Sequence, residues 1–214
     1  MSSLIEQIES SLPPRIELPD EIKKLFQWIE KRGSISEYEE TLYGSIHPFG
    51  IDCDSCIDIS FYAEKSTNNW WCFDVENFRE LNVSERLSIF AQTGGDGSVA
   101  AFWLDDNNKQ KIVHIGSGSG SDLMCILAEN PIDFIRLIAI GYNEICWQEE
   151  FNEIPQSRQY TTKNPNIEFQ KWVESEFDTT IPLTASEIVK YSSTMWNINS
   201  DDSFCKWISK INIR

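Results

Sequence analysis

The stretch from residue 90 to residue 141 constrains the fold most, because it contains consecutive strand patterns separated by turn formers. Residues 94–97 (Gly-Gly-Asp-Gly) adopt positive φ at low steric cost, which predicts a tight turn. The apolar residues 98–104 predict a strand, and the turn formers at 105–108 predict its end. Residues 111–115 (Lys-Ile-Val-His-Ile) predict the strand that returns beside it.

A Gly-Ser run at residues 116–120 leads from this pair of strands into a long apolar stretch. We interpret residues 123–140 as helical, with an interruption at Asn130 and Pro131, because proline is favoured in the first turn of a new helix. Gly141 is expected to end this helix.

Two more strands are expected before this core. Ile57, Ile59 and Phe61 alternate with polar residues, which is the pattern of a strand with one buried face. Residues 70–73 (Trp-Trp-Cys-Phe) are expected to pair with it as a hairpin, and another strand is expected near residues 87–92.

Helices are expected on both sides of the strands. Helical patterns occur at residues 4–12, 20–32, 164–177, 184–195 and 201–211, whereas residues 34–50 are interpreted as a helical turn or irregular chain. Because the strands cluster in the middle, the sequence predicts an α+β fold, with an antiparallel sheet of about five strands flanked by N-terminal and C-terminal helices.

The chain of 214 residues is long enough for one good-sized domain. Residues 154–163 are rich in Pro, Ser, Arg and Thr, which favours a linker. We therefore predict an α+β domain at residues 1–150 and a C-terminal helical extension at residues 151–214 that packs on the same domain.

The charge is strongly negative, at −16 with a sequence pI near 4.5. This argues against sequence-independent binding to nucleic acid or to an anionic membrane, since both need basic patches. Residues 33–108 hold 14 acidic and three basic residues. Such a segment is suited to docking a basic partner, although acidity also keeps proteins soluble, and both interpretations stay open.

The sequence predicts a cytoplasmic protein. It shows no signal-peptide pattern and no apolar run long enough to span a bilayer. The six cysteines are therefore expected to be reduced thiols rather than a disulfide framework.

Cys53 and Cys56 form a lone Cys-x-x-Cys pair, and the candidates to complete a zinc site are His47 and Cys72. Their spacing matches no recognised metal or redox motif, so we expect no metal and no cofactor, with a residual metal or dithiol role left open. Asp52, Asp54 and Asp58 lack the glycine and distal glutamate of a calcium loop. An acidic face is the preferred interpretation.

The loop at residues 116–121 superficially resembles a phosphate-binding loop between a strand and a helix. It lacks the third glycine and the Gly-Lys-Ser/Thr of the known motifs, so a flexible loop is favoured. His114 lies within a predicted strand and is interpreted as a packed side chain. We find no nucleophile setting and expect no enzymatic activity.

Trp70 and Trp71 would place one ring on each face of a strand, and an exposed Trp beside acidic residues can anchor a partner. The sequence therefore predicts a partner-binding surface. Its residues are Asp52, Asp54, Asp58, Trp70, Trp71, Asp105 and Asp106.

Several of these features, in this order, resemble the SUKH immunity superfamily over residues 18–145. They are Leu18 and Pro19 opening an amphipathic helix, the glycine-rich turn at 94–97 before a strand, the turn at 105–108, Val113 and His114 on the returning strand, and the helix with Asp133, Phe134 and Ile135. The chain departs from the family pattern at Arg32 and Gly33, where an Asn-Gly pair is usual, and it extends beyond the common core.

The resemblance implies a non-enzymatic cytosolic protein with an antiparallel sheet. Bacterial members bind and neutralise a cognate toxin, often a nuclease, so the expected function is immunity through tight binding to a toxin with a basic surface. Two alternatives stay open: a regulatory or scaffold module without a linked toxin, and a nucleotide-binding protein or enzyme that uses the loop at 116–121.

Overall fold

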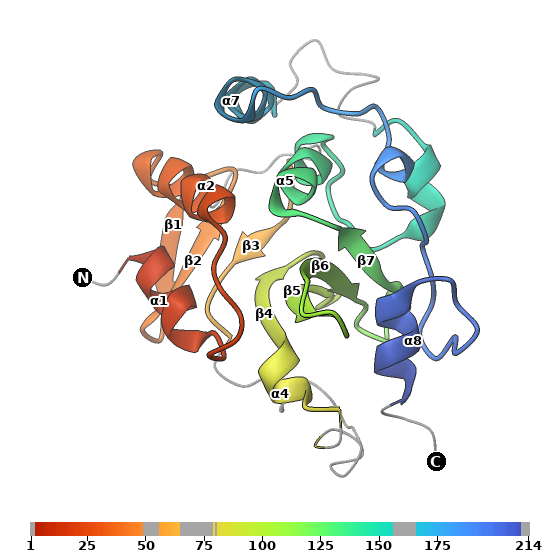
Figure 1. Ribbon diagram of the computed structural model, residues 1–214. Helices are drawn as coiled ribbons and strands as arrows, with labels where there is room; N and C mark the ends of the chain where they lie inside the picture. The colour runs from red at the N-terminus through yellow and green to blue at the C-terminus, as the bar shows by residue number, and fades with distance from the viewer. Residues whose placement is uncertain (1–2, 49–55, 65–78, 80, 156–165, 211–214) are drawn as a thin grey trace.

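The computed structural model describes residues 3–48, 56–64, 79, 81–155 and 166–210, and it combines helices with one open antiparallel sheet (Figure 1). Within these residues the sheet has seven strands in the order β1-β2-β3-β4-β5-β6-β7. Their bounds are β1 Ile35–Tyr38, β2 Thr41–Ser45, β3 Ser60–Phe61, β4 Leu87–Gln92, β5 Val99–Leu104, β6 Gln110–Ile115 and β7 Met124–Ala128. The expected antiparallel sheet is confirmed, but the expected number of five strands is wrong.

The hairpins at the centre of the sheet follow the sequence pattern. β4 and β5 are joined by the turn at residues 94–97, where Gly97 has φ +92°, as the glycine-rich pattern predicts. β5 and β6 pair along their whole length, from Val99 opposite Ile115 to Leu104 opposite Gln110. These strands hold the centre of the sheet.

The two strands missed at residues 34–50 form the β1–β2 hairpin, so the interpretation of this stretch as a helical turn or irregular chain is wrong. Its two-residue turn places Glu39 at φ +48° and Glu40 at φ +67°. Such turns normally use Asn-Gly, because two consecutive residues need positive φ. Two glutamates give no such signal.

β7 lies where a helix was expected, at the start of the apolar run. Met124, Cys125, Leu127 and Ala128 are all buried, so the strand does not alternate between apolar and polar residues. A short apolar run of this kind cannot be assigned to strand or helix by periodicity. The helix begins only after Asn130, which caps α5 (Pro131–Ala139) with its side chain.

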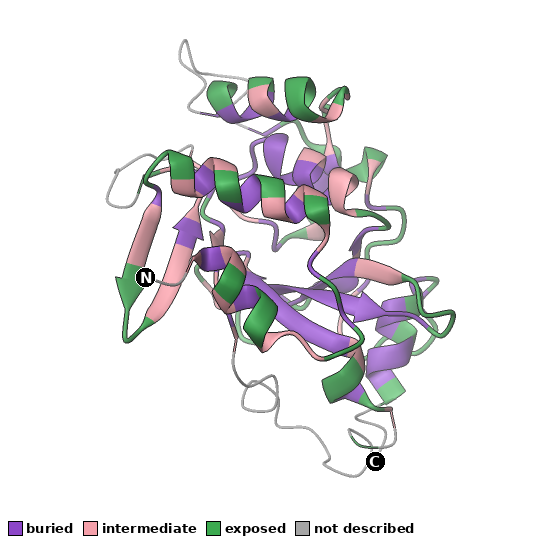
Figure 2. Cartoon of the chain, turned by 60° about the vertical axis from the view of Figure 1, so that its left-hand side comes forward, coloured by how far each residue is buried: buried purple, intermediate pink, exposed green. Residues whose placement is uncertain are grey.

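Six α-helices lie in the described residues: α1 Leu4–Ser11, α2 Asp20–Lys31, α4 Val83–Arg86, α5 Pro131–Ala139, α7 Ile167–Phe177 and α8 Ser203–Ser209. α1, α2, α5 and α7 contribute to the larger apolar cluster, on one face of the sheet. α4 and α8 contribute to the smaller cluster on the other face, where Trp103 meets Phe204 and Trp207. Figure 2 shows the buried strands between these helices.

The C-terminal segment contributes to both apolar clusters: Phe169 and Val173 of α7 to the larger, Phe204 and Trp207 of α8 to the smaller. The helix expected at 184–195 is wrong beyond one 3-10 turn, η3 (Ala185–Glu187). The chain then leaves the helical path, and at Thr194 its backbone pairs with Leu123, the residue before β7.

No helix in the described part of the chain is both long enough and apolar enough to cross a membrane.

Candidate interaction surface

Four of the seven predicted partner-binding residues, Asp52, Asp54, Trp70 and Trp71, lie outside the described residues. Of the remaining three, Asp58 lies at one end of the sheet and the adjacent Asp105 and Asp106 at the other. Asp58 precedes β3 at the end of the sheet that holds the β4–β5 turn.

Asp105 follows β5 at the other end of the sheet. Because β5 has six residues, it spans roughly 20 Å, so Asp58 and the Asp105–Asp106 turn face opposite ends.

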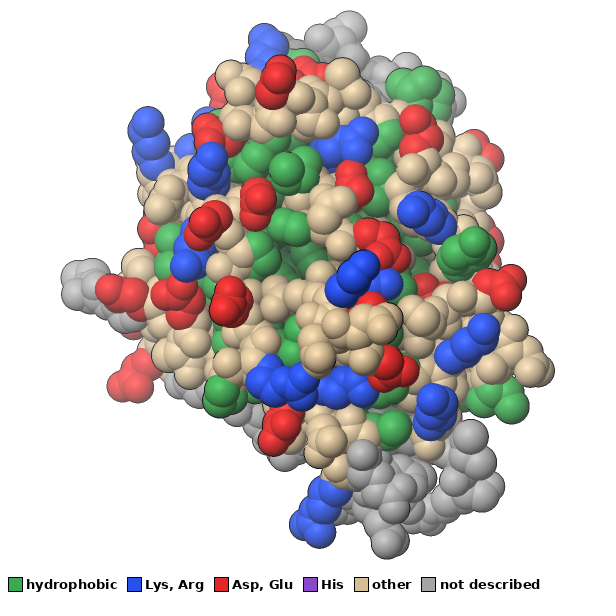
Figure 3. Space-filling model, in the orientation of Figure 1, with side chains coloured by type: hydrophobic (Ala, Val, Ile, Leu, Met, Phe, Trp, Pro, Cys, Tyr) green, Lys and Arg blue, Asp and Glu red, His purple; other side chains and the backbone are tan. Residues whose placement is uncertain are grey.

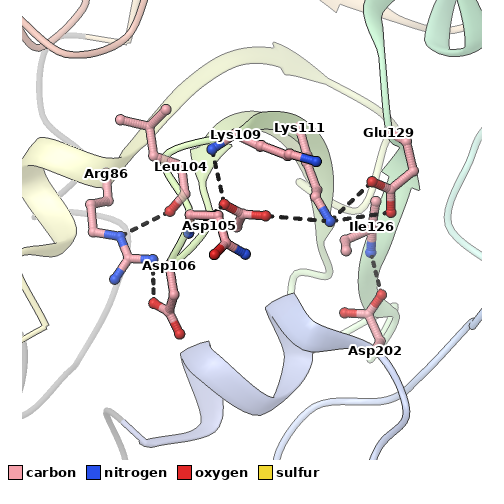
Figure 4. Close-up of polar contacts among 10 residues, drawn as sticks. Arg86, Leu104, Asp105, Asp106, Lys109, Lys111, Ile126, Glu129 and Asp202 are labelled. Carbon is pink, nitrogen blue, oxygen red and sulfur yellow. Dashed lines mark hydrogen bonds and ion pairs between the residues drawn. The ribbon is translucent and has the colours of Figure 1, made fainter.

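Asp105 organises the β5–β6 turn from within. Its side chain accepts hydrogen bonds from the backbone N–H groups of Asn107 at 2.8 Å and Lys109 at 2.9 Å, and it lies 3.7 Å from the Lys111 ammonium (Figure 4). The residue is 9% exposed. Its carboxylate is therefore engaged in shaping the turn rather than turned outward.

Asp106 is exposed but paired, at 2.8 Å from the guanidinium of Arg86 (Figure 4). That guanidinium also donates to the carbonyl of Leu104 and lies 4.9 Å from the centre of the Trp207 ring. Lys111 is similarly paired with Glu129 at 3.0 Å. The charges at this end of the sheet are therefore largely matched.

A small pocket of about 110 Å³ opens between β7 and the start of α8. Asp202 lies in its wall, and its carboxylate accepts from the backbone N–H groups of Ile126 and Cys205. Burial raises the pKa of Asp202, although these hydrogen bonds oppose the rise. Pockets for small molecules typically measure about 300–1,000 Å³, so this one is too small for a typical ligand.

The other end of the sheet is built around Asp96, in the β4–β5 turn. Its carboxylate accepts from the Ser98 backbone and hydroxyl, the Ser117 hydroxyl at 2.7 Å and the Ser121 backbone at 2.8 Å. Burial alone would raise the pKa of Asp96, but these hydrogen bonds outweigh it and lower the pKa to about 2. The loop at 116–121 is thus folded around a carboxylate that is negatively charged near neutral pH.

The hydrogen bonds of the loop at 116–121 argue against the alternative that this loop binds phosphate. The N–H of Ser117 donates to Ser98, that of Gly118 to the carbonyl of Ser121, and that of Gly120 to Ser117. A phosphate-binding loop needs such N–H groups to point at its anion. Here these N–H groups are engaged by Ser98, Ser121 and Ser117, and the nearby Asp96 carboxylate would repel an anion.

His114 lies buried beneath these loops, as the packed side chain that its strand position predicts. Its Nδ1 donates to the Leu123 carbonyl at 3.0 Å, so its Nε2 accepts from the Thr93 hydroxyl at 3.0 Å. Burial lowers the pKa of His114 to about 4, which keeps the ring neutral near pH 7.

Acidic and aromatic side chains surround this end of the sheet. Glu144 accepts from the Gly95 N–H at 2.7 Å, and Glu149 and Glu150 follow in the 3-10 helix η2 (Gln148–Asn152). Trp147, between them, is 37% exposed. Burial, followed by the negative charges of Glu144 and Glu149, raises the pKa of Glu150. The Glu150 carboxylate is therefore repelled by the other two.

Asp58 joins this group, because its backbone N–H donates to the Asn143 carbonyl at 2.7 Å and its side chain is exposed. We call Asp58, Glu144, Trp147, Glu149 and Glu150 the loop-end acidic surface. Within the described residues, none of its four carboxylates forms an ion pair with Lys or Arg.

Of these five residues, only Asp58 was predicted from the sequence. The signal was present in residues 143–154, which contain four glutamates and no Lys or Arg around one tryptophan. The net charge counted over residues 109–214 is only moderately negative, so averaging over that long window concealed the local excess.

The possible metal site at Cys53, Cys56, Cys72 and His47 falls partly outside the described residues, which include neither Cys53 nor Cys72. His47 Nε2 instead meets the side-chain oxygen of Asn166. In the part of the chain that is described, no three His, Cys, Asp or Glu side chains are grouped to hold a metal ion.

Comparison with protein-family models, with curated proteins and with solved structures finds no match to this chain. The resemblance to the SUKH superfamily therefore stays a prediction from the sequence pattern.

Proposed function

We propose that this protein binds and neutralises a cognate protein toxin in the cytosol, and that the loop-end acidic surface receives a basic region of that toxin. The observation that carries the proposal is the convergence of Glu144, Glu149 and Glu150 without a cation from the described residues. Like charges held together destabilise the isolated protein, and a docked cationic surface would relieve that repulsion.

The composition of the surface supports a protein partner. An uncompensated negative field raises the rate at which a basic partner associates. Trp147 adds a partly exposed aromatic ring, and in the sequence it lies between Glu144 and Glu149. Buried aromatic anchors surrounded by polar contacts typically carry much of the energy of an interface.

The immunity role follows from the sequence resemblance, because bacterial SUKH proteins neutralise toxins. Many such toxins act on nucleic acids, so their active sites must attract phosphates with basic residues. An acidic protein can block such a site by occupying the same electrostatic surface.

The direct test is co-expression with the product of the adjacent reading frame, scoring cell survival and co-purification. The proposal predicts that the neighbour is toxic alone and that the protein rescues growth as a stable complex. The variant Glu149→Lys/Glu150→Lys should lose rescue, whereas Glu85→Lys/Glu174→Lys, with the same change in net charge at other exposed sites, should retain it.

Two results would contradict the proposal. Toxicity that the protein does not relieve would exclude immunity against that neighbour. A harmless neighbour that does not co-purify would favour the regulatory or scaffold module. If both charge variants rescue equally, the protein is an immunity protein whose interface lies elsewhere.

A further inference from the structure

The two edge strands of the sheet, β7 and β1, differ in whether other described segments cover them. At β7 the N–H of Met124 donates to the Ser193 carbonyl at 2.7 Å, and that of Ile126 donates to Asp202 at 2.9 Å. The C-terminal segment thus covers this edge. β1 is the opposite edge strand, at the outer side of the sheet in Figures 1 and 2.

The orientation of the β1 backbone follows from its partner strand. The N–H of Leu42 donates to the side chain of Gln7 at 2.9 Å, and therefore points away from β1. Leu42 lies opposite Glu37, so this is a pair without mutual hydrogen bonds. The N–H and C=O of Glu37 consequently point outward from the sheet, and alternation gives Ile35 the same orientation.

These outward groups are open within the described part of the chain, where no hydrogen bond reaches the backbone N–H or C=O of Ile35 or Glu37 on that side. A row of unpaired backbone groups on an edge strand is a template for another strand. The outer edge of β1 offers two such residues, spaced correctly for antiparallel or parallel pairing.

The side chains at this edge are acidic and exposed. Glu37, Tyr38, Glu39 and Glu40 are consecutive exposed residues, with Tyr38 at 66%. None of the three glutamates forms an ion pair with another described residue. In Figure 3 the left margin below α2, over α1 and this hairpin, shows mostly acidic side chains.

The hairpin is also braced in position. The side chain of Gln7, on α1, donates to the Glu40 carbonyl at 2.9 Å while it accepts from Leu42. The hairpin is therefore held in place before a partner binds, which reduces the conformational entropy that is lost on binding.

We propose that the outer edge of β1 accepts an extended basic segment of a partner protein as an eighth strand. The segment would exchange backbone hydrogen bonds with Ile35 and Glu37, and its Lys or Arg side chains would lie beside Glu37, Glu39 and Glu40. A second copy of this chain is a poor occupant, since pairing β1 with β1 would bring its glutamates together.

This inference goes beyond the proposed immunity function and does not depend on it, because the hairpin and the loop-end acidic surface are separate sets of residues. It can be tested with synthetic peptides on the full chain. The probe is a fluorescent eight-residue peptide of alternating Lys and Val, and binding is followed by anisotropy.

Two control peptides separate strand pairing from charge. One alternates Glu and Val. The other is the Lys-Val peptide with N-methyl groups on alternate residues, which keeps its charge but cannot donate along one edge. We expect the unmodified Lys-Val peptide to bind at least about tenfold more tightly than either control. Equal binding of the N-methylated peptide would overturn strand addition.

Variants of the protein locate the site. Glu37→Gln removes the charge alone, whereas Glu37→Pro also removes the outward N–H, a change that edge strands tolerate. Proline should weaken the peptide affinity further than glutamine, while Glu174→Gln should leave it unchanged. Circular dichroism checks the fold, and if Glu37→Pro does not fold, the peptide comparison alone decides. Equal affinities for the glutamine and proline variants would contradict the pairing.

Discussion

The carboxylate of Asp96 accepts a hydrogen bond from the backbone N–H of Ser121, 2.8 Å away, and so joins two loops that are 25 residues apart. The same oxygen accepts from the Ser117 hydroxyl at 2.7 Å. One side chain in the β4–β5 turn therefore sets the conformation of the Gly-Ser loop that follows β6, and with it the base of the loop-end acidic surface.

Replacing Asp96 by Asn should lower the free energy of unfolding by roughly 2 kcal/mol at pH 7, because the pKa of Asp96 falls from its ordinary value of 3.8 to about 2 on folding. Urea denaturation measures the change. Asp122→Asn is the matched control, an exposed aspartate nearby. Equal stabilities of the two variants would contradict the account of the loops.

The same depressed pKa gives a pH dependence. The stabilisation from Asp96 is complete above about pH 4 and is lost as the pH falls toward 2, since the unfolded chain takes up the proton first. Urea denaturation at pH 4 and at pH 2.5 should show this loss in the parent protein and a much smaller one in Asp96→Asn. If Asp96→Asn loses as much stability between pH 4 and pH 2.5 as the parent protein does, the loss comes from other groups.

The titration of His114 should change the stability of the protein over a separate, higher range of pH. Its pKa falls from 6.5 to about 4 on folding, so stability is expected to decline as the pH falls from about 6.5 to 4. His114→Gln keeps a donor and an acceptor for Leu123 and Thr93 but does not titrate. Urea denaturation between pH 7 and 4 should therefore give a flatter profile for this variant, and identical profiles would contradict the prediction.

Two glycines in the Gly-Ser loop should differ in their tolerance of alanine. A Cβ at Gly116 would lie 2.5 Å from the Ser121 carbonyl oxygen, whereas at Gly118 the nearest atom is 3.7 Å away, in the Met195 side chain. Gly116→Ala should cost about 2 kcal/mol or more of stability. Gly118→Ala should cost about 1 kcal/mol, from its positive φ of +73° alone. Thermal unfolding compares them, and the reverse order would be inconsistent with this loop geometry.

The β1–β2 turn can be made more stable at the expense of its charge. Glu39→Asn/Glu40→Gly places the preferred residues at the two positive-φ positions and should raise the free energy of unfolding by about 1 kcal/mol. The same variant should bind the Lys-Val peptide more weakly. A loss of peptide affinity together with a gain in the free energy of unfolding cannot come from misfolding. A decrease in the free energy of unfolding would contradict the prediction, because it would show that the two glutamates already suit this turn.

The centre of the fold could be predicted because its signals are local. Residues 94–97 and 105–108 are turn-forming residues that can be recognised without tertiary information. The strands on either side of these turns could therefore be predicted as well. β7 was missed because Met124, Cys125, Leu127 and Ala128 are apolar and buried on both faces of the strand, which removes the alternation on which strand prediction depends. Where a helix was expected after Thr184, the chain instead makes a tertiary contact that no local pattern indicates, the pairing of Thr194 with Leu123.

The candidate site was harder to predict, because it is assembled from distant segments. The sequence predicted a partner-binding surface rich in acidic residues, but it grouped Asp58 with Asp105 and Asp106. The strand β5 separates them, and Asp105 points into its own turn. The backbone of Asp58 meets the segment that contains Glu144 and Glu150 through its hydrogen bond to Asn143, which no local pattern could reveal.

The most direct measurement of the central claim is the association rate between this protein and the toxin recovered by co-expression, by stopped-flow fluorescence at about 50 mM and 500 mM salt. If the loop-end acidic surface docks a basic partner, Glu149→Lys/Glu150→Lys should slow association by roughly tenfold or more at low salt and far less at high salt, because salt screens the attraction. Glu85→Lys/Glu174→Lys should have little effect. Equal rates for all three proteins at both salt concentrations would contradict the claim.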